Sequence, residues 1–236
     1  MIDGGSTGTV LSFTHGEDPN CIVLGFVLTR GQGQSGGAVL CSGSSPTIAN
    51  CLIVGNRTTD PDGAAVYCID SQAAFVNCTI ADNGGDAQGT ALCLVGSNVT
   101  VVDSILWGNG TNEIFLSEAN ELGIIYTDVA GGWPGLGNTD VDPLFAQRGY
   151  WIDPDNPGIV LNPSEETAVW IAGDYHLRSQ GGRWDPQTRV WVADEVTSPC
   201  IDTGDPLEAI GQEPVPNGGV INMGAYGGTT EAGKTY

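Results

Sequence analysis

The chain is poor in basic residues and contains no long hydrophobic run. Seven Lys and Arg residues stand against 28 Asp and Glu residues, which gives a formal net charge of −21 at pH 7. Such a surface repels phosphate backbones and anionic lipids, so we expect no nucleic-acid partner. No apolar run approaches the roughly 20 residues that cross a bilayer, so we expect no membrane insertion. The opening "MIDGGSTGTV" has no signal-peptide pattern, so a secreted protein would carry its export signal upstream of this chain.

Motifs for common cofactors are also lacking. The sequence contains no CxxC pair and no HExxH. We expect the glycine- and serine-rich stretches "GSTGTV" and "GQGQSGG" to be turns, since neither opens a predicted helix. Zinc and nucleotide chemistry are therefore not expected, and we predict no cofactor apart from a structural calcium ion, considered below.

Glycine and proline are plentiful instead, at 36 and 13 residues, and they punctuate a repeat. The stretches "VLGFVLTRG", "IANCLIVGN", "FVNCTIADN" and "VVDSILWGN" align on a corner position that lies 25 to 27 residues apart in successive copies. That period holds several strands of three to five residues and leaves no room for a helix. Units of this kind must stack to bury an apolar face, so the sequence predicts an all-β fold, a parallel β-helix.

Two sets of polar residues recur in the repeat. The corner column contains Gly25, Asn50, Asn77 and Asp103, and a second Asn follows six residues later in three copies, at Asn56, Asn83 and Asn109. Asn tolerates left-handed backbone angles, and its amide can bond to an identical amide in the next coil. We therefore interpret these residues as structural ladders and not as a catalytic site.

Five of the seven cysteines also recur in the repeat. Cys51 and Cys78 follow the corner column, whereas "GGAVLC", "GAAVYC" and "GTALC" end at Cys41, Cys68 and Cys93. We expect all five to point inward as free thiols, because stacked parallel Cβ atoms do not suit a disulfide torsion. An odd number of cysteines cannot pair completely, and nothing in the sequence pairs Cys21 with Cys200.

The repeats resemble right-handed parallel β-helix repeat proteins, the large secreted or surface proteins of planctomycete-like and other environmental bacteria. The stretches "YTDVAGGWPGLGNTDVDPLF", "DYHLRSQGGRWDP", "SPCIDTGDP" and "NGGVINMGAYGGTTEA" are similar to the closing segments of that family. The resemblance implies β-helix coils over residues 1–127 and a C-terminal closing and capping region over 128–236. An apparent insertion lies near 146–173, and most proteins of this kind have no assigned activity.

Members of that family usually carry further coils and a cap before the segment that begins "IDGG". Here that segment opens the chain, so the strand edges of the first coil have no visible cover. Open edges pair readily with other chains. A second copy stacked on this end would make a head-to-tail contact, which grows into a filament.

Calcium is the metal that the sequence favours. The loops "NTDVDP" and "DPDNPG" concentrate hard oxygen ligands, with Asp140 and Asp142 in the first and Asp153 and Asp155 in the second. Neither loop has the EF-hand spacing, and the same residues are typical of plain turns.

A glycan-active enzyme is the main alternative, because β-helices host polysaccharide lyases and glycoside hydrolases. Within the repeats the only basic residues are Arg30 and Arg57, in non-equivalent places. Asn138-Thr139-Asp140 matches one pectinase-like motif whose partner motifs are missing, so we interpret it as chance. Five of the six Trp residues follow residue 130, where they either cap the last coil or form a glycan-binding surface.

The sequence therefore favours a non-catalytic extracellular or cell-surface module with a structural or adhesive role. Its expected partners are other copies of itself or extracellular glycans. The two alternatives are a glycan-active enzyme and a glycan-binding module.

Overall fold

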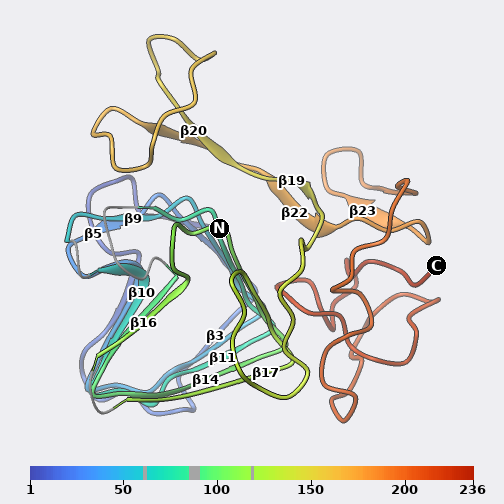
Figure 1. The fold of residues 1–236 in the computed structure, drawn as a ribbon, viewed down its shortest axis with the longest axis horizontal. Coiled ribbons are helices and arrows are strands. Elements are labelled where there is room, and N and C mark those ends of the chain that lie inside the picture. Colours follow the sequence, from blue (N-terminus) through green and yellow to red (C-terminus); the bar gives the residue numbers. More distant parts are fainter. Residues whose placement is uncertain (61–62, 85–90, 118–119) are drawn as a thin grey trace.

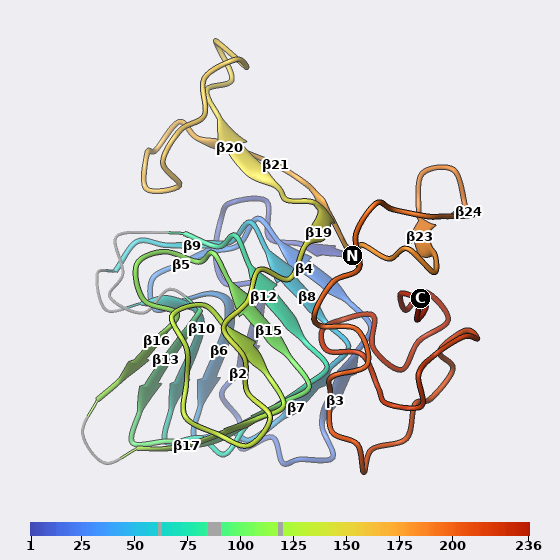
Figure 2. The same ribbon diagram turned by 45° about the vertical axis from the view of Figure 1, so that its right-hand side comes forward.

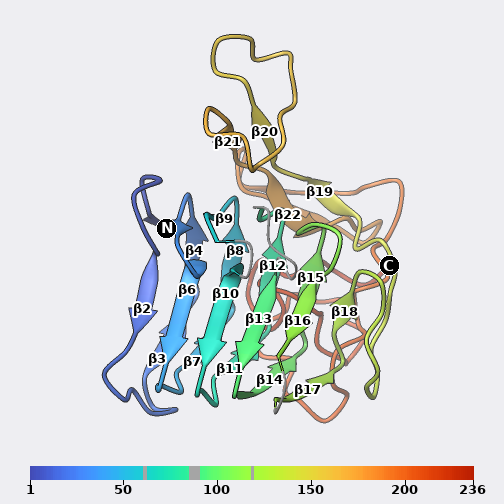
Figure 3. The same ribbon diagram turned by 60° about the vertical axis from the view of Figure 1, so that its left-hand side comes forward.

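The N-terminal half is a solenoid of three parallel sheets. The computed structural model describes residues 1–60, 63–84, 91–117 and 120–236, and within them it contains strands and turns but no helix. Viewed down the solenoid the coils outline a triangle, and viewed from the side their strands lie next to one another in order (Figures 1 and 3). The expected all-β parallel β-helix is confirmed. No helix in the described part is long and apolar enough to cross a bilayer.

Each sheet takes one strand from each successive coil. The first sheet consists, in spatial order, of β1 (Ile2–Asp3), β4 (Val27–Thr29), β8 (Leu52–Val54), β12 (Thr79–Ala81), β15 (Ile105–Trp107) and β18 (Asp128–Val129). The second consists of β2 (Leu11–Phe13), β6 (Gly36–Ser42), β10 (Ala64–Ile69), β13 (Leu92–Val95) and β16 (Ile114–Leu116). The third consists of β3 (Ile22–Leu24), β7 (Thr47–Ala49), β11 (Ala74–Val76), β14 (Asn98–Val102) and β17 (Glu121–Ile125). A short extra pair, β5 (Gln32–Gly33) and β9 (Arg57–Thr58), lies at one corner.

The parallel register stacks equivalent side chains inside the triangle. Ile53 pairs with Ile80, and Ile80 pairs with Leu106, and all three are completely buried. On the third sheet Phe75 stacks between Ile48 and Val101 in the same way. Each such side chain contributes ~1.5–3 kcal/mol on burial, so the alternation of the sequence repeat becomes a continuous core.

The corner column turns the chain from the third sheet to the first. The backbone φ is 75° at Gly25, 47° at Asn50, 46° at Asn77 and 51° at Asp103. These are left-handed values, which Gly, Asn and Asp adopt at little cost and β-branched residues do not. The residue types at this column are therefore explained by backbone geometry.

The cysteines follow the expected columns with one exception. Cys41 pairs in register with Cys68, and Cys51 and Cys78 are buried in the core. Cys93 pairs with Tyr67, whereas Leu94 pairs with Cys68, so Cys93 does not belong to the Cys41–Cys68 column. The aligned stretch "GTALC" starts at Gly89, and residues 89 and 90 lie outside the described residues. Among the described residues no two cysteines form a disulfide.

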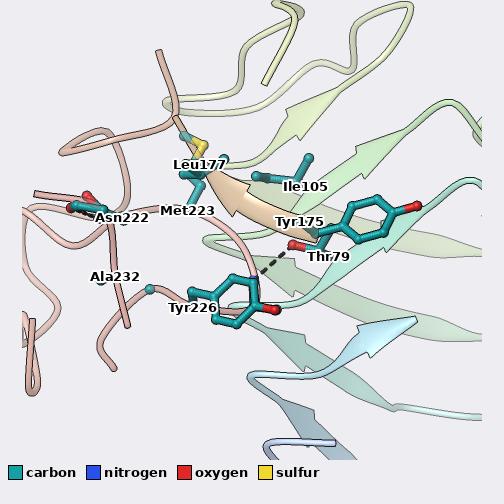
Figure 4. Close-up of a pocket in the computed structure, with 11 residues that line it drawn as sticks. Thr79, Ile105, Tyr175, Leu177, Asn222, Met223, Tyr226 and Ala232 are labelled. Atoms are coloured by element: carbon teal, nitrogen blue, oxygen red, sulfur yellow. Dashed lines mark hydrogen bonds between the residues drawn. The ribbon is translucent and has the colours of Figure 1, made fainter. Parts of the chain in front are cut away.

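The C-terminal part runs along the side of the coils, and this differs from the expectation that it would cover their lower end (Figures 1 and 2). It contains three antiparallel pairs: β19 (Phe145–Gln147) with β22 (Asp174–Leu177), β20 (Tyr150–Ile152) with β21 (Val169–Ile171), and β23 (Arg183–Asp185) with β24 (Val190–Val192). The outward side chains of the first sheet are themselves apolar and need a cover. Leu52, Ala81 and Ile105 form one buried cluster with side chains of the C-terminal part, among them Tyr175 and Met223 (Figure 4).

The segment directly after β18 packs on the last coil. Thr139 bridges to Asp128, and Trp133 packs against the solenoid core. The later tryptophans form cross-strand pairs instead of an end cap or an open row. Trp151 and Trp170 lie with ring centroids 5.3 Å apart, and Trp184 and Trp191 lie 5.6 Å apart. Such pairs stabilise a hairpin beyond the area that they bury.

Candidate functional site

A polar groove of about 330 Å³ lies where one corner of the coils meets the insertion near 146–173. One wall comes from β5, β9 and the residue after them, and the other from the tip of the insertion. Its lining is Gln32, Arg57, Thr58, Thr59, Pro163, Ser164 and Glu166. Hydroxyl, amide and carboxylate groups of this kind suit a polar ligand such as a sugar.

Arg57 forms the base of the groove and is itself almost fully buried. Its Nη1 donates to the carbonyl of Glu165 at 3.0 Å, and its Nη2 donates to Oε1 of Gln32 at 2.9 Å. The guanidinium also lies 5.7 Å from the ring centroid of Trp151. Burial lowers the pKa of Arg57, and the nearby Glu166 charge opposes that shift. The side chain holds the insertion on the corner and leaves few donors for a ligand.

A glycine and a partly buried ion pair hold the insertion against the same corner. A Cβ at Gly55, where φ is 63°, would lie 2.3 Å from the Trp170 ring, so the ring packs directly on the backbone. One coil further on, the Asp82 carboxylate pairs with the Arg148 guanidinium. The Tyr175 hydroxyl donates to the second oxygen of Asp82 at 2.6 Å, and burial followed by the Asp82 charge raises the pKa of Tyr175. The neighbouring Asp82 also raises the pKa of Arg148.

A second cluster of titratable groups surrounds His176. Its Nδ1 lies 2.5 Å from Oδ1 of Asp174, and its Nε2 lies 3.3 Å from Oε2 of Glu231. The imidazole stacks on Tyr226 with ring centroids 3.7 Å apart, and Arg183 pairs with the other oxygen of Asp174. Both ring nitrogens face carboxylates, and His176 is only 2 % exposed. His176 therefore connects Asp174 with Glu231 and Tyr226, and neither of its ring nitrogens faces a cleft.

The Asn residues after the corner form a continuous buried ladder. Asn56 donates from Nδ2 to Oδ1 of Asn83 at 2.9 Å, and Asn83 donates in the same way to Asn109 at 2.8 Å. Asn109 ends the ladder by donating to Glu113 at 2.6 Å, and burial raises the pKa of that carboxyl. We call Asn56, Asn83 and Asn109 the inner column.

The corner column bonds sideways to the C-terminal part. Asn50 donates to the carbonyls of Ala225 and Gly227 at 3.2 and 2.8 Å, and Asn77 donates to the carbonyl of Asn222 at 3.0 Å. Oδ1 of Asp103 accepts from the backbone N–H of Asp205 at 2.6 Å. These residues therefore attach the C-terminal part to the coils, and Asn77 also donates to the carbonyl of Asp103 in the next coil at 3.3 Å.

The predicted calcium ligands occupy turns. Asp140 accepts the N–H of Gly131 at 3.0 Å, and Asp142 accepts the N–H of Leu144 at 2.9 Å. Asp153 accepts the N–H of Asp155 at 2.9 Å. Within the described ranges no three Asp, Glu, His or Cys side chains converge on a metal-sized position. Calcium at these loops stays a prediction.

The basic and motif residues weighed for catalysis also have structural contacts. Arg30 pairs with Asp3 of the first coil, and Asn138 donates to the carbonyl of Ile124 at 3.0 Å. Sequence reasoning missed Glu113 and the Asp82, Arg148 and Tyr175 cluster. The members of that cluster lie 66 and 93 residues apart, and no spacing rule joins them.

The coil-forming stretch matches a family model. Residues 12–128 match the model described as "Right handed beta helix region", which spans the coils from β2 to the first residue of β18. The coils belong to the right-handed β-helix family. Comparison with curated proteins and with solved structures gave no match. The β-helix family establishes the fold and the hand of the coils, and the function has to be argued from the surface.

Proposed function

We propose that this β-helix is a non-catalytic extracellular or cell-surface module with a structural or adhesive role, and that it stacks head-to-tail through its first coil. The observation that carries the proposal is the position of the first coil at the edge of all three sheets. Its strands β1, β2 and β3 are the outermost members of all three sheets in the described part of the chain. Outermost parallel strands present backbone groups that a further strand can pair with.

Apolar side chains accompany these edges. Ile22 and Leu24 of β3 are 61 % and 59 % exposed, and Phe26, just after β3, is 40 % exposed. The equivalent positions of β7 are Thr47 and Ala49, which are smaller or polar. The enrichment is therefore specific to the first coil, as expected of a surface that another chain covers.

The contacts of the basic residues support a structural role. Arg30, Arg148 and Arg183 are paired with carboxylates, and Arg57 donates to backbone carbonyls. A lyase base needs a side chain that reaches substrate, and these four hold segments of the protein together.

Solution assembly tests the proposal. Light scattering and negative-stain electron microscopy over a range of protein and calcium concentrations should show rods that lengthen with concentration. Leu24→Lys should abolish rods, because it places a charge at the stacking edge. Leu207→Lys, at a side chain that is 92 % exposed in the C-terminal part, is the matched control and should leave them intact. A wild-type protein that stays monomeric throughout would refute stacking.

The groove supports a second candidate, a glycan-binding or glycan-active module. Its hydroxyl-lined walls could hold a sugar, and Thr59 projects from one wall as an exposed residue. Screening on glycan arrays, together with lyase and hydrolase assays, tests this function. Thr59→Trp fills the groove and should remove binding, whereas Thr100→Trp on the exposed face of β14 should not.

A further inference from the structure

Two carboxylates of the closing segment, residues 198–236, each have one buried oxygen without a partner among the described residues. Glu213 is 7 % exposed, and its Oε1 accepts the backbone N–H groups of Asn222 and Gly228, both at 2.8 Å. Its Oε2 is buried and has no hydrogen-bond partner among the described residues. An oxygen of this kind costs free energy unless something else satisfies it.

Asp202 belongs to the same network of hydrogen bonds. Its Oδ2 accepts the hydroxyl of Thr235 at 2.7 Å, while its Oδ1 is buried without a partner among the described residues. The backbone of Gly218 lies against the carboxylate, because a Cβ there would stand 2.3 Å from its carbon. With a φ of 59°, Gly218 allows the loop to close over Asp202.

Asn222 joins the two carboxylates. The Asp202 N–H donates to Oδ1 of Asn222 at 2.7 Å, and the Asn222 N–H donates to Glu213. Burial raises the pKa of Glu213, and the Asp202 charge adds to that shift. No ion pair found in the described part of the chain includes either acid, and the nearby Lys234 ammonium lies 4.2 Å from the Trp191 ring centroid instead.

Two like charges whose unpartnered oxygens are buried need a counter-charge. A shared proton is one solution, and a cation is the other. The two N–H groups on Glu213 favour its ionised form, because hydrogen bonds to the charged form stabilise it. Hard cations prefer such oxygen ligands, and calcium tolerates sites completed by carbonyls, amides and water.

We propose that the Oε2 of Glu213 and the Oδ1 of Asp202 bind a divalent cation of the calcium class inside the closing segment. The site is separate from the Asp140, Asp142, Asp153 and Asp155 turns. The bound ion links the loops around 202, 213–219 and 235. Because Asn222 in the same network accepts from Asn77, occupancy also stabilises the attachment of the closing segment to the coils.

Calcium titration of the full chain tests the site. After removal of divalent ions with a chelator, isothermal titration with CaCl₂ alone should show uptake, and calcium should raise the melting temperature. Glu213→Gln and Asp202→Asn should each lower the calcium affinity at least tenfold. The double variant Asp153→Asn/Asp155→Asn is the matched control and should bind as the wild type does.

Two results would overturn the proposal. The first is uptake that survives both Glu213→Gln and Asp202→Asn but disappears in the control variant. The second is a wild-type protein that takes up no calcium while Glu213→Gln raises its melting temperature near neutral pH, which is the behaviour of a shared proton. Circular dichroism verifies the fold of each variant. If one variant does not fold, the wild-type titration and the remaining single variant still decide between these outcomes.

Discussion

The inner column and the corner column are built from the same kind of residue in the same coils, yet their amides bond in different directions. Asn83 of the inner column bonds to the coil before it and the coil after it. Asn50 of the corner column bonds only to backbone carbonyls of the closing segment in the contacts found. The difference follows from the side on which each column lies, because one faces the stacked interior and the other faces a neighbouring segment.

The two columns therefore stabilise different parts of the molecule. The inner column holds the solenoid together along its axis, whereas the corner column holds a separate segment against its side. Damage to the first should unfold the coils, and damage to the second should release the closing segment first.

The largest effect is expected from Asn83→Ala in the inner column. The Oδ1 of Asn83 accepts two N–H groups of Asn56, and its amide donates to the carbonyl of Ile53 and to Asn109. Several buried groups lose partners at once, so the free energy of unfolding should fall by about 4 kcal/mol. Urea unfolding monitored by circular dichroism measures it. A loss no larger than that of Asn50→Ala would contradict the distinction between the columns.

The opposite sign is expected for Asp103→Asn in the corner column. Burial raises the pKa of Asp103 from 3.8 to about 6, and repulsion by Asp205 and Glu208 adds to the shift. Between these values the folded protein holds a proton that the unfolded chain has released, so Asp103 makes stability fall as the pH rises.

Asp103→Asn should therefore raise the free energy of unfolding at pH 7 by up to about 3 kcal/mol, since one pKa unit is worth about 1.4 kcal/mol. The new amide retains the acceptor for the Asp205 N–H. Chemical unfolding at pH 4, 5, 6 and 7 measures the slope for both proteins. An unchanged difference between the variant and the wild type across this range would show that Asp103 does not titrate there.

A smaller and more local loss is expected from Asn77→Ala. The amide of Asn77 donates to the carbonyls of Asp103 and Asn222 at 3.3 and 3.0 Å. Losing both bonds should cost about 2 kcal/mol and should loosen the closing segment before the coils unfold. Limited proteolysis followed by mass spectrometry should locate the first cuts beyond residue 198. First cuts within the coils would argue against a separately attached segment.

The smallest effect is expected from Thr79→Val. The Thr79 hydroxyl accepts the N–H of Ala225 at 3.0 Å across the boundary shown in Figure 4. Valine preserves the shape and leaves one buried N–H unpaired, so the loss should be about 1 kcal/mol. Thermal unfolding compares it with Thr100→Val, an exposed threonine of β14 whose replacement should change little.

The cysteines and the tryptophans show which residues the sequence repeat could place and which it could not. The fixed period correctly aligned Cys41 with Cys68. It placed Cys93 one residue out of register, because the number of residues between successive strands varies and Leu94 pairs with Cys68 instead. The late tryptophans carried no period, and their cross-strand pairing follows from hairpins that close only in three dimensions.

The sequence by itself determined the solenoid. Apolar and Asn positions recur every 25 to 27 residues, and such a repeat buries its apolar face by stacking coils whose corner residues adopt left-handed backbone angles. Only the tertiary structure decided where the last hundred residues lie and which carboxylates they bury. Asp82 meets Arg148 and Tyr175, and Asp103 meets Asp205, through contacts between segments far apart in the chain. Local propensity carries no information about such contacts, because they depend on the apolar outer face of the first sheet, which the C-terminal part covers.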